Sequence, residues 1–283
     1  MSDTAFQTSY RQELINGFEQ QQSLMRMGVT TEGQIKGNSC VFDVIDSGGA
    51  TAVTRGINGQ IPPRTDNNTQ LTCTLAEWHD LAVKSDFNVF ASQGNQIAQM
   101  QRTTMAVINR KIDSDIITEL STGTVDTGSA QVASLRMITK SKAILGLAKV
   151  PFDQNIWCAI TPAFEAYMTE TKEFTDKNYV TAQPINDGHT AWADRPGYYQ
   201  YLGIKFFVHP DLSGVGTSSA KCLMWHKNAI GHAVDVAGID TNVGYDGKQA
   251  QSWCRCSTNM GSKLLQNSGV IVMYHDDSAM VGQ

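Results

Sequence analysis

A long polar stretch, from Asp46 to Gln70, constrains the fold of this chain more than any other feature. It is rich in Gly, Pro, Asn and Thr, and strand-like segments flank it at 40–45 and 71–75. In compact domains, a connection longer than about 12–15 residues without secondary structure is uncommon unless it is functional. The stretch has too few apolar residues to form a core of its own, so it needs a second surface to hold a fixed shape. A neighbouring copy of the same chain is the simplest source of that surface.

The composition is that of a folded protein with few charges at its surface. The chain has 283 residues, 41% of them hydrophobic and 17% charged, and this length favours two domains. Its net charge is −5 and it has no basic run, so neutralisation of DNA phosphates is not expected to be its main task. A sparsely charged surface suits a protein that hides much of its exterior against other proteins.

Neither a membrane span nor a secretory signal is expected. No apolar run approaches the ~20 residues that cross a bilayer, and residues 1–19 lack a charged segment followed by an apolar one. The six cysteines are too few for a disulfide scaffold in so long a chain. Cys40, Cys73, Cys158 and Cys222 lie in apolar segments, and we interpret them as small core residues of a protein made in a reducing cytoplasm and not exported.

The first half of the chain predicts a hairpin between two helices. Residues 2–27 carry apolar side chains at near-helical spacing. At 71–75 apolar residues alternate with threonine, as in a half-buried antiparallel strand, and the Asn-Gly pair at 58–59 is typical of a tight turn. No Gly or Pro interrupts 95–121, where one apolar stripe predicts a helix of about 40 Å. The stripe runs through Ile97, Gln101, Met105, Ile108, Ile112, Ile116 and Leu120, of which Gln101 is the one polar member.

The second half predicts a compact region of mixed helices and strands. A threonine followed by a proline at 161–162 is a helix start, because the hydroxyl caps the helix and proline fits its first turn. The other expected elements are a helix at 133–147, strands at 155–160, 203–209 and 221–225, a short helix at 227–234, and closing strands at 253–257 and 269–274 with a turn at 259–261.

Four segments, taken in order, resemble the tailed-phage major capsid protein family, which has the Hong-Kong-97-type fold. They are Val107–Asp113, Tyr201–Leu212, Cys222–Ala233 and Gly261–Met273. The family commonly has a long spine helix, a Leu-Gly strand ending near a proline, a strand that runs into an alanine-bearing helix, and a closing Gly-Val strand. The resemblance covers nearly the whole chain and implies an α+β fold.

The resemblance also implies a division of the chain and a function. Residues 1–38 correspond to the N-terminal arm, and 39–77 to the extended β-hairpin loop (E-loop) that lies across the next subunit. Residues 78–122 and 243–283 correspond to the peripheral domain with its long spine helix, and 123–242 to the axial domain. The implied function is that of a major capsid protein whose hexamers and pentamers form the icosahedral shell around the double-stranded DNA of a tailed bacteriophage.

Residues of the extension loop are expected to contact the neighbouring subunit. The isoleucines would act as apolar anchors, the prolines reduce the entropy lost when the loop is fixed, and the charged residues would pair with charges on the neighbour. The expected interface residues are Arg55, Ile57, Ile61, Pro62, Pro63, Arg64 and Asp66. The alternative for the charged residues is that they only keep the loop soluble, because exposed ion pairs contribute about 0–1 kcal/mol.

The resemblance implies further partners. Some relatives join their subunits covalently through a lysine of this loop, but 46–70 contains none, so we expect a non-covalent shell. About 40 residues precede the first expected strand, too few for a large fused scaffolding domain, which implies a separate scaffolding protein. A portal protein and a decoration protein are the other implied partners, with packaged DNA held weakly and without specificity. The implied location is the virion capsid, assembled in the cytoplasm of a bacterial host and without a membrane.

The polar clusters of the sequence do not predict a catalytic, cofactor-binding or metal-binding site. We interpret His275-Asp276-Asp277 as a solvated tail after the last strand, and Trp78-His79-Asp80 as capping or surface residues just after a strand. Cys254 and Cys256 lack a second cysteine pair, and the histidines at 226 and 232 do not have the spacing of helical metal ligands. The chain has neither the serine motif of hydrolases nor a glycine-rich phosphate loop.

Two other functions stay open at this point. One is an encapsulin-like cellular compartment with the same fold, which would hold a cargo enzyme in place of a genome. The other is a metal-dependent hydrolase with an α/β core. A groove for a cargo peptide would indicate the first function, and one tightly held metal ion per chain would indicate the second.

Overall fold

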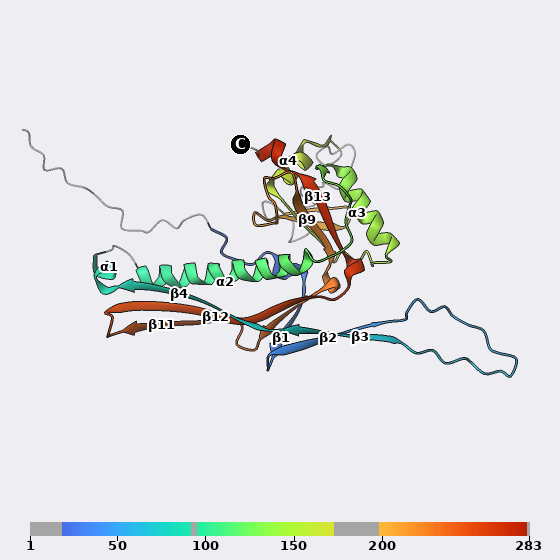
Figure 1. Cartoon of the computed structure of the whole chain (residues 1–283), viewed down its shortest axis with the longest axis horizontal. Coiled ribbons are helices and arrows are strands. Elements are labelled where there is room, and N and C mark those ends of the chain that lie inside the picture. The colour runs from blue at the N-terminus through green and yellow to red at the C-terminus, as the bar shows by residue number, and fades with distance from the viewer. Residues whose placement is uncertain (1–18, 92–94, 173–197, 282–283) are drawn as a thin grey trace, which may run out of the picture.

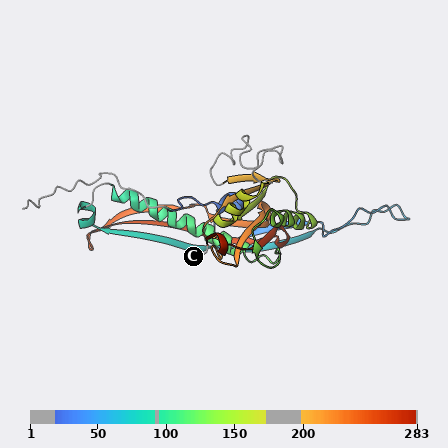
Figure 2. The same cartoon turned by 90° about the horizontal axis from the view of Figure 1, so that it is seen from above.

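The computed structural model describes residues 19–91, 95–172 and 198–281. This part of the chain is elongated, with a body built on two sheets and a long hairpin that leaves the body at one end (Figure 1; Figure 2 from above). The helices are η1 Met25–Gly28, α1 Asp86–Ala91, α2 Gln96–Leu120, α3 Leu135–Leu147, α4 Pro162–Glu170, η2 Lys227–Ala229, η3 Asn267–Gly269 and α6 Ser278–Val281. The strands are β1 Thr30–Ile35, β2 Ser39–Asp46, β3 Asn67–Thr74, β4 Ala76–Ser85, β5 Gln131–Val132, β6 Ile156–Ile160, β7 Tyr198–Tyr201, β8 Ile204–Val208, β9 Ala220–His226, β10 Ile230–Asp235, β11 Asp240–Asp246, β12 Gln251–Leu264 and β13 Val270–Asp276.

Strand β12 is the centre of a five-stranded sheet. It pairs antiparallel with β4, β10 and β11, and β1 runs parallel to β10. It continues unbroken through 259–261, so the predicted turn there is wrong. Gly261 serves a different purpose, because a Cβ atom at this position would lie 2.4 Å from the carbonyl oxygen of Thr74. Glycine in the strand therefore permits a close approach of the hairpin backbone.

The long helix predicted at 95–121 is confirmed as α2, which lies along one face of the five-stranded sheet (Figure 1). The side chain of Asn95 caps its start by accepting a hydrogen bond of 3.0 Å from the Ala98 N–H. On the buried face, the Thr104 hydroxyl contacts the sulfur atoms of Cys254 and Cys256 in β12. Packing against the sheet therefore adds to the helix propensity of an uninterrupted segment.

The predicted apolar stripe of α2 is correct only in the C-terminal half of the helix. Its last four members, Ile108, Ile112, Ile116 and Leu120, are buried, and Ile97 and Gln101 are half-buried. Met105 is 43% exposed, and the buried positions near it are Met100 and Thr104. Steps of four residues drift away from the helical repeat of 3.6, so a stripe counted forward from Ile97 leaves the buried face at Met105.

A six-stranded sheet forms the second part of the body, in the order β5-β13-β9-β6-β8-β7. One face packs against α3 and α4 in an apolar cluster that contains Ile138 and Phe164. The other face carries Trp157 and Trp225 and packs in one cluster with Ile108–Leu120 of α2 and apolar residues of the first sheet. The predicted start of α4 is confirmed, with Thr161 as its cap. Both sheets therefore share the C-terminal half of α2.

The predicted helix at 227–234 is a single turn, η2, followed by strand β10. Strand β10 is hydrogen-bonded to β1 on one side and to β12 on the other, so tertiary pairing overrides the local preference of this segment. Residues 78–80 lie inside β4 and not after a strand. Strands β1, β4, β5, β7 and β11 and helices α1 and α6 were not predicted.

The helix predicted at 2–27 is wrong for residues 19–24, which are non-helical, and residues 2–18 lie outside the described residues. The expected boundary between 242 and 243 does not follow the sheets either. Strand β10, before this boundary, belongs to the five-stranded sheet, whereas β13, after it, belongs to the six-stranded sheet. The chain therefore passes between the two sheets more often than the sequence indicated.

Candidate assembly interface

The hairpin β2–β3 carries the long loop, residues 47–66, away from both sheets (Figures 1 and 2). Every residue from 45 to 70 is exposed, and the side chain of Ile57 is fully open to solvent. The predicted tight turn is present at the tip, where the Gly59 N–H donates to the Gly56 carbonyl at 2.9 Å and Gly59 has a φ of +72°. The loop is thus an extended arm with an apolar side chain near its tip.

The root of the hairpin, in contrast, is fixed to the body. The Phe42 ring lies over Gly231 of β10, where a Cβ atom would be 2.8 Å from the ring. Cys73 is 1% exposed and packs with Ile35 and Ala233. Because the root is fixed and the tip is exposed to solvent, the hairpin holds the long loop at a distance from the body of its own chain.

The expected interface residues all lie on this exposed arm, but one ion pair is internal to it. Arg64 Nη2 contacts Asp66 Oδ1 at 2.8 Å, with the two side chains 55% and 53% exposed. An exposed pair of this kind contributes about 0–1 kcal/mol. Ile57 and Ile61, exposed by 107% and 65%, stand out as the apolar groups that gain most from being covered.

The segment before η1 is held against α2 by a buried carboxylate. Asp113, 1% exposed, accepts hydrogen bonds from the backbone N–H groups of Leu24 at 3.0 Å and Met25 at 3.1 Å. The side chains of Ser23 and Gln20 also donate to this carboxylate. Because Asp113 satisfies these backbone groups, the segment does not need helical hydrogen bonds of its own.

His209, which follows β8, completes the environment of Asp113. Its Nδ1 accepts a hydrogen bond of 3.1 Å from the Asp211 N–H, so the ring proton lies on Nε2, which donates to Asp113 Oδ2 at 3.1 Å. Burial by itself raises the pKa of Asp113, but the hydrogen bonds from His209, Ser23 and Leu24 outweigh it and lower the pKa below its usual value. The sequence offers one signal of this role, an acidic residue next to the apolar position Ile112.

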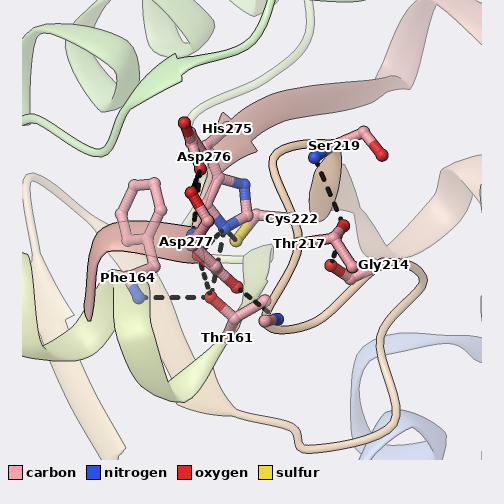
Figure 3. Close-up of polar contacts among 11 residues, drawn as sticks. Thr161, Phe164, Gly214, Thr217, Ser219, Cys222, His275, Asp276 and Asp277 are labelled. Atoms are coloured by element: carbon pink, nitrogen blue, oxygen red, sulfur yellow. Dashed lines mark hydrogen bonds and ion pairs between the residues drawn. The ribbon is translucent and has the colours of Figure 1, made fainter. Parts of the chain in front are cut away.

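The triplet His275-Asp276-Asp277 is not the solvated tail that we expected, because His275 and Asp277 are fully buried. Figure 3 shows His275 and Asp277 turned toward Thr161 at the start of α4, with His275 Nε2 2.7 Å from Asp277 Oδ1. The Thr161 hydroxyl donates to the same Asp277 oxygen at 3.2 Å. Sequence reasoning missed this network, since its members are far apart along the chain.

This network resembles a Cys-His-Asp constellation but lacks its geometry. The Cys222 sulfur and the Asp277 carboxylate both face His275 Nε2, at 3.8 and 2.7 Å, whereas a catalytic triad uses opposite ring nitrogens. Burial raises the pKa of the Cys222 thiol well above its usual value, so the thiol stays protonated. The cluster connects the end of β13 to α4 and serves as a structural link.

The other polar motifs form separate pairs. His79 contacts Glu77 at 2.9 Å on the exposed side of β4, and Lys111 lies 3.8 Å above the Trp78 ring on the helix side. The two histidines are apart, His226 with Asp153 and His232 with Ser262. Within the described residues, no group of three or more His, Cys, Asp or Glu could hold a metal ion, and no helix is long and apolar enough to cross a membrane.

A comparison of the whole sequence with known protein families gives one match, which agrees with the elongated body, the projecting hairpin and the long helix that both sheets share. The profile of the family described as phage capsid protein matches residues 2–277. The chain belongs to the phage capsid protein family. No curated protein matches this chain. Membership of this family favours the capsid function over the cellular compartment and the metal-dependent hydrolase. The protein is a major capsid protein of a phage, with a structural role.

Solved structures show the fold of this capsid protein. A structure from Mycobacterium phage Che8 superposes with a TM-score of 0.73 at 15% identity, covering 95% of this chain and 96% of that chain. The capsid of Ralstonia phage GP4 gives 0.71 at 12% identity, with 97% and 96% covered. The mature capsid of bacteriophage PhiM1 gives 0.69 at 10% identity, with 96% and 92% covered. The expected Hong-Kong-97-type fold is confirmed over nearly the whole chain.

Proposed function

We propose that this capsid protein assembles into hexamers and pentamers, and that the long loop of each subunit lies across the next subunit. The observation that carries the proposal is the exposure of every residue from 45 to 70 on a hairpin whose root is rigid. An arm that contacts so little of its own chain gains its fixed shape from a neighbour. Repeated around closed symmetry, many weak contacts of this kind give a stable shell.

The proposed interface residues differ in what they supply. Ile57 and Ile61 are the anchors, since covering an exposed isoleucine contributes about 1.5–3 kcal/mol. Pro62 and Pro63 limit the conformations of the free loop. Arg55, Arg64 and Asp66 supply charges at the edge of the contact, with the internal pair of Arg64 and Asp66 orienting the guanidinium group.

The proposed domains follow the sheets. The peripheral domain comprises α2 with the five-stranded sheet, and the axial domain comprises the six-stranded sheet with α3 and α4. Residues 19–29 form the root of the N-terminal arm, which Asp113 holds on α2. The shared half of α2 couples the two domains, so that a contact made by the hairpin is transmitted to the whole subunit.

The proposed virion is a non-covalent icosahedral shell around double-stranded DNA, assembled in the cytoplasm of a bacterial host. A separate scaffolding protein directs closure, a portal protein occupies one vertex, and a decoration protein binds the outside. A net charge of −5 keeps the contact with packaged DNA weak. Co-expression with and without the scaffolding protein tests its role. Uniform closed shells formed by the capsid protein alone would exclude it.

A double substitution, Ile57→Ser with Ile61→Ser, tests the loop contact. Both side chains are exposed, so folding of the free subunit is expected to be unchanged, while the concentration needed for assembly rises about tenfold or more. Leu147→Ser is the matched control, because Leu147 is 85% exposed but lies at the end of α3. Sedimentation and negative-stain microscopy measure assembly. Shells from the double variant at the wild-type concentration would contradict the proposal.

A further inference from the structure

The root of the long hairpin holds two cysteines directly opposite each other. Cys40 of β2 and Cys73 of β3 are partners in the antiparallel register. Opposite residues of such a pair point to the same face, and both cysteines pack in the small cluster that includes Ile35 and Ala233. Both thiols are free in this structure.

The backbone register at this pair brings the two cysteines within reach of a strained disulfide. The Leu75 N–H donates to the Asn38 carbonyl at 2.8 Å, and the ladder alternates between hydrogen-bonded and non-hydrogen-bonded pairs. Cys40 and Cys73 are thus a hydrogen-bonded pair, for which the Cα atoms lie about 5.5 Å apart. Disulfides in proteins span about 4.4–6.8 Å between Cα atoms and about 3.5–4.5 Å between Cβ atoms. Opposite Cβ atoms lie about 4.5–5.5 Å apart, and a hydrogen-bonded pair is at the wide end of this range. A bond therefore requires a small local shift that draws the two side chains together, and the strain makes it easy to reduce.

The two thiols differ in access. Cys73 is 1% exposed, whereas Cys40 is half-buried next to Val41, which is 51% exposed. An oxidant in solution therefore reaches Cys40 first, and Cys73 is positioned to complete the bond from inside.

We propose that Cys40 and Cys73 form a dithiol site that low-molecular-weight disulfides, such as oxidised glutathione, convert to an intrachain disulfide. In the first step the Cys40 thiolate attacks glutathione disulfide, which forms a mixed disulfide and releases one glutathione thiolate. In the second step the Cys73 thiolate attacks the Cys40 sulfur, which forms the Cys40–Cys73 bond and releases the second glutathione thiolate. Two protein thiols are oxidised, one glutathione disulfide is reduced, and the two protons pass to the released glutathione.

The surroundings of the pair set the pH dependence of this reaction. Burial raises the pKa of Cys73 to about 11, with further increases from Cys40, Asp115 and Glu119 against a decrease from Lys263. Burial also raises the pKa of Cys40, and Glu32 adds to the increase. Only thiolates react, so the rate of formation increases about tenfold for each pH unit around neutrality.

The bond would close the hairpin at its root and leave the loop 47–66 free at the tip. The inference rests on the register of β2 and β3 and not on the shell function, so a free subunit is enough to test it.

Trypsin provides a direct test, because Arg55 and Arg64 lie in the exposed loop between the two cysteines. The subunit is incubated with oxidised glutathione at pH 8, alkylated and nicked with trypsin. Cys40 is the only cysteine before Arg55, so a link between the two fragments must involve it. We expect the fragments to stay together on a non-reducing gel and to separate after reduction, with mass spectrometry identifying a peptide that joins 40 to 73.

Single substitutions supply the controls. Cys73→Ser is expected to carry one glutathione on Cys40 and to form no disulfide between the two tryptic fragments. Cys40→Ser is expected to show neither the glutathione adduct nor the disulfide. Cys222→Ser, a change at a fully buried thiol, is expected to keep the disulfide between the fragments. Fragments that separate without reduction, a link from Cys40 to any other cysteine, or a dimer joined through Cys40 would each overturn the proposal. Circular dichroism of Cys40→Ser, a substitution at a half-exposed position, shows that the fold is kept.

Discussion

His209 Nε2 lies 3.1 Å from Asp113 Oδ2, and both side chains are buried, one after strand β8 and the other on helix α2. The same carboxylate binds the backbone of Leu24 and Met25. One charged group therefore joins the arm root, the long helix and the six-stranded sheet. A buried carboxylate with this many donors stabilises the fold only as long as all of its partners are in place.

Removal of this carboxylate is expected to release the arm root. Asp113→Ala leaves His209 and two backbone N–H groups without their acceptor, which should lower the free energy of unfolding by about 3–5 kcal/mol. Urea unfolding measures the loss, and faster tryptic cleavage after Arg26 reports local release. Ser114→Ala, at the exposed neighbouring position, is expected to change neither. Equal stability of Asp113→Ala and wild type would contradict the role of the carboxylate.

Acid is expected to weaken the subunit through His232. Burial, with the nearby Arg26, lowers the pKa of His232 to about 4 from 6.5. Between these values the unfolded chain binds a proton that the folded chain does not, so stability falls as pH decreases from 6.5 to 4. The shift corresponds to about 3 kcal/mol.

Urea unfolding of wild type and His232→Gln across this pH range measures that contribution. The pH slope should be shallower in the variant, and His79→Gln, at an exposed histidine, should keep the wild-type slope. Parallel curves for wild type and His232→Gln would count against the assignment.

The buried network at the end of β13 is expected to be structural. Asp277→Ala removes the acceptor for His275 and Thr161 and should cost about 3–5 kcal/mol. Asp276→Ala, one residue earlier but partly exposed, should cost far less. Thermal unfolding of both variants gives the comparison, and a similar melting temperature for the two would show that the network does not stabilise the subunit.

Gly261 is expected to tolerate no side chain. Gly261→Ala places a Cβ atom against the Thr74 carbonyl, and relief of this clash requires a shift of the hairpin root at a cost of about 1–3 kcal/mol. Gly247→Ala is the matched control, because its nearest neighbour atom is 3.9 Å away. Chemical unfolding of both variants tests the close approach, which a neutral Gly261→Ala would disprove.

The shell is expected to contain no covalent links between subunits, because the loop has no lysine. Boiled particles should migrate as a single monomer band on a denaturing gel. A ladder of multiples that survives both boiling and reduction would refute this prediction.

Local sequence was sufficient where the cause of the structure is local. The absence of Gly and Pro from 95–121, the cap at Thr161 and the alternation at 71–75 each correctly predicted an element, since propensity and periodicity act within a few residues. The long polar stretch likewise predicted an exposed loop, because it has no apolar side to bury.

Tertiary structure alone decided the features that depend on distant partners. Residues 230–235 became a strand because β1 and β12 pair with them, and Met105 turned outward because the sheet covers another side of α2. His275 and Asp277 can be buried because they pair with each other and because the hydroxyl of Thr161, more than a hundred residues earlier, donates to the Asp277 carboxylate. The sequence by itself thus determined the exposed arm and the long helix. The buried polar links formed only once folding had brought remote segments together, because burying a polar group costs free energy that a hydrogen-bond partner offsets.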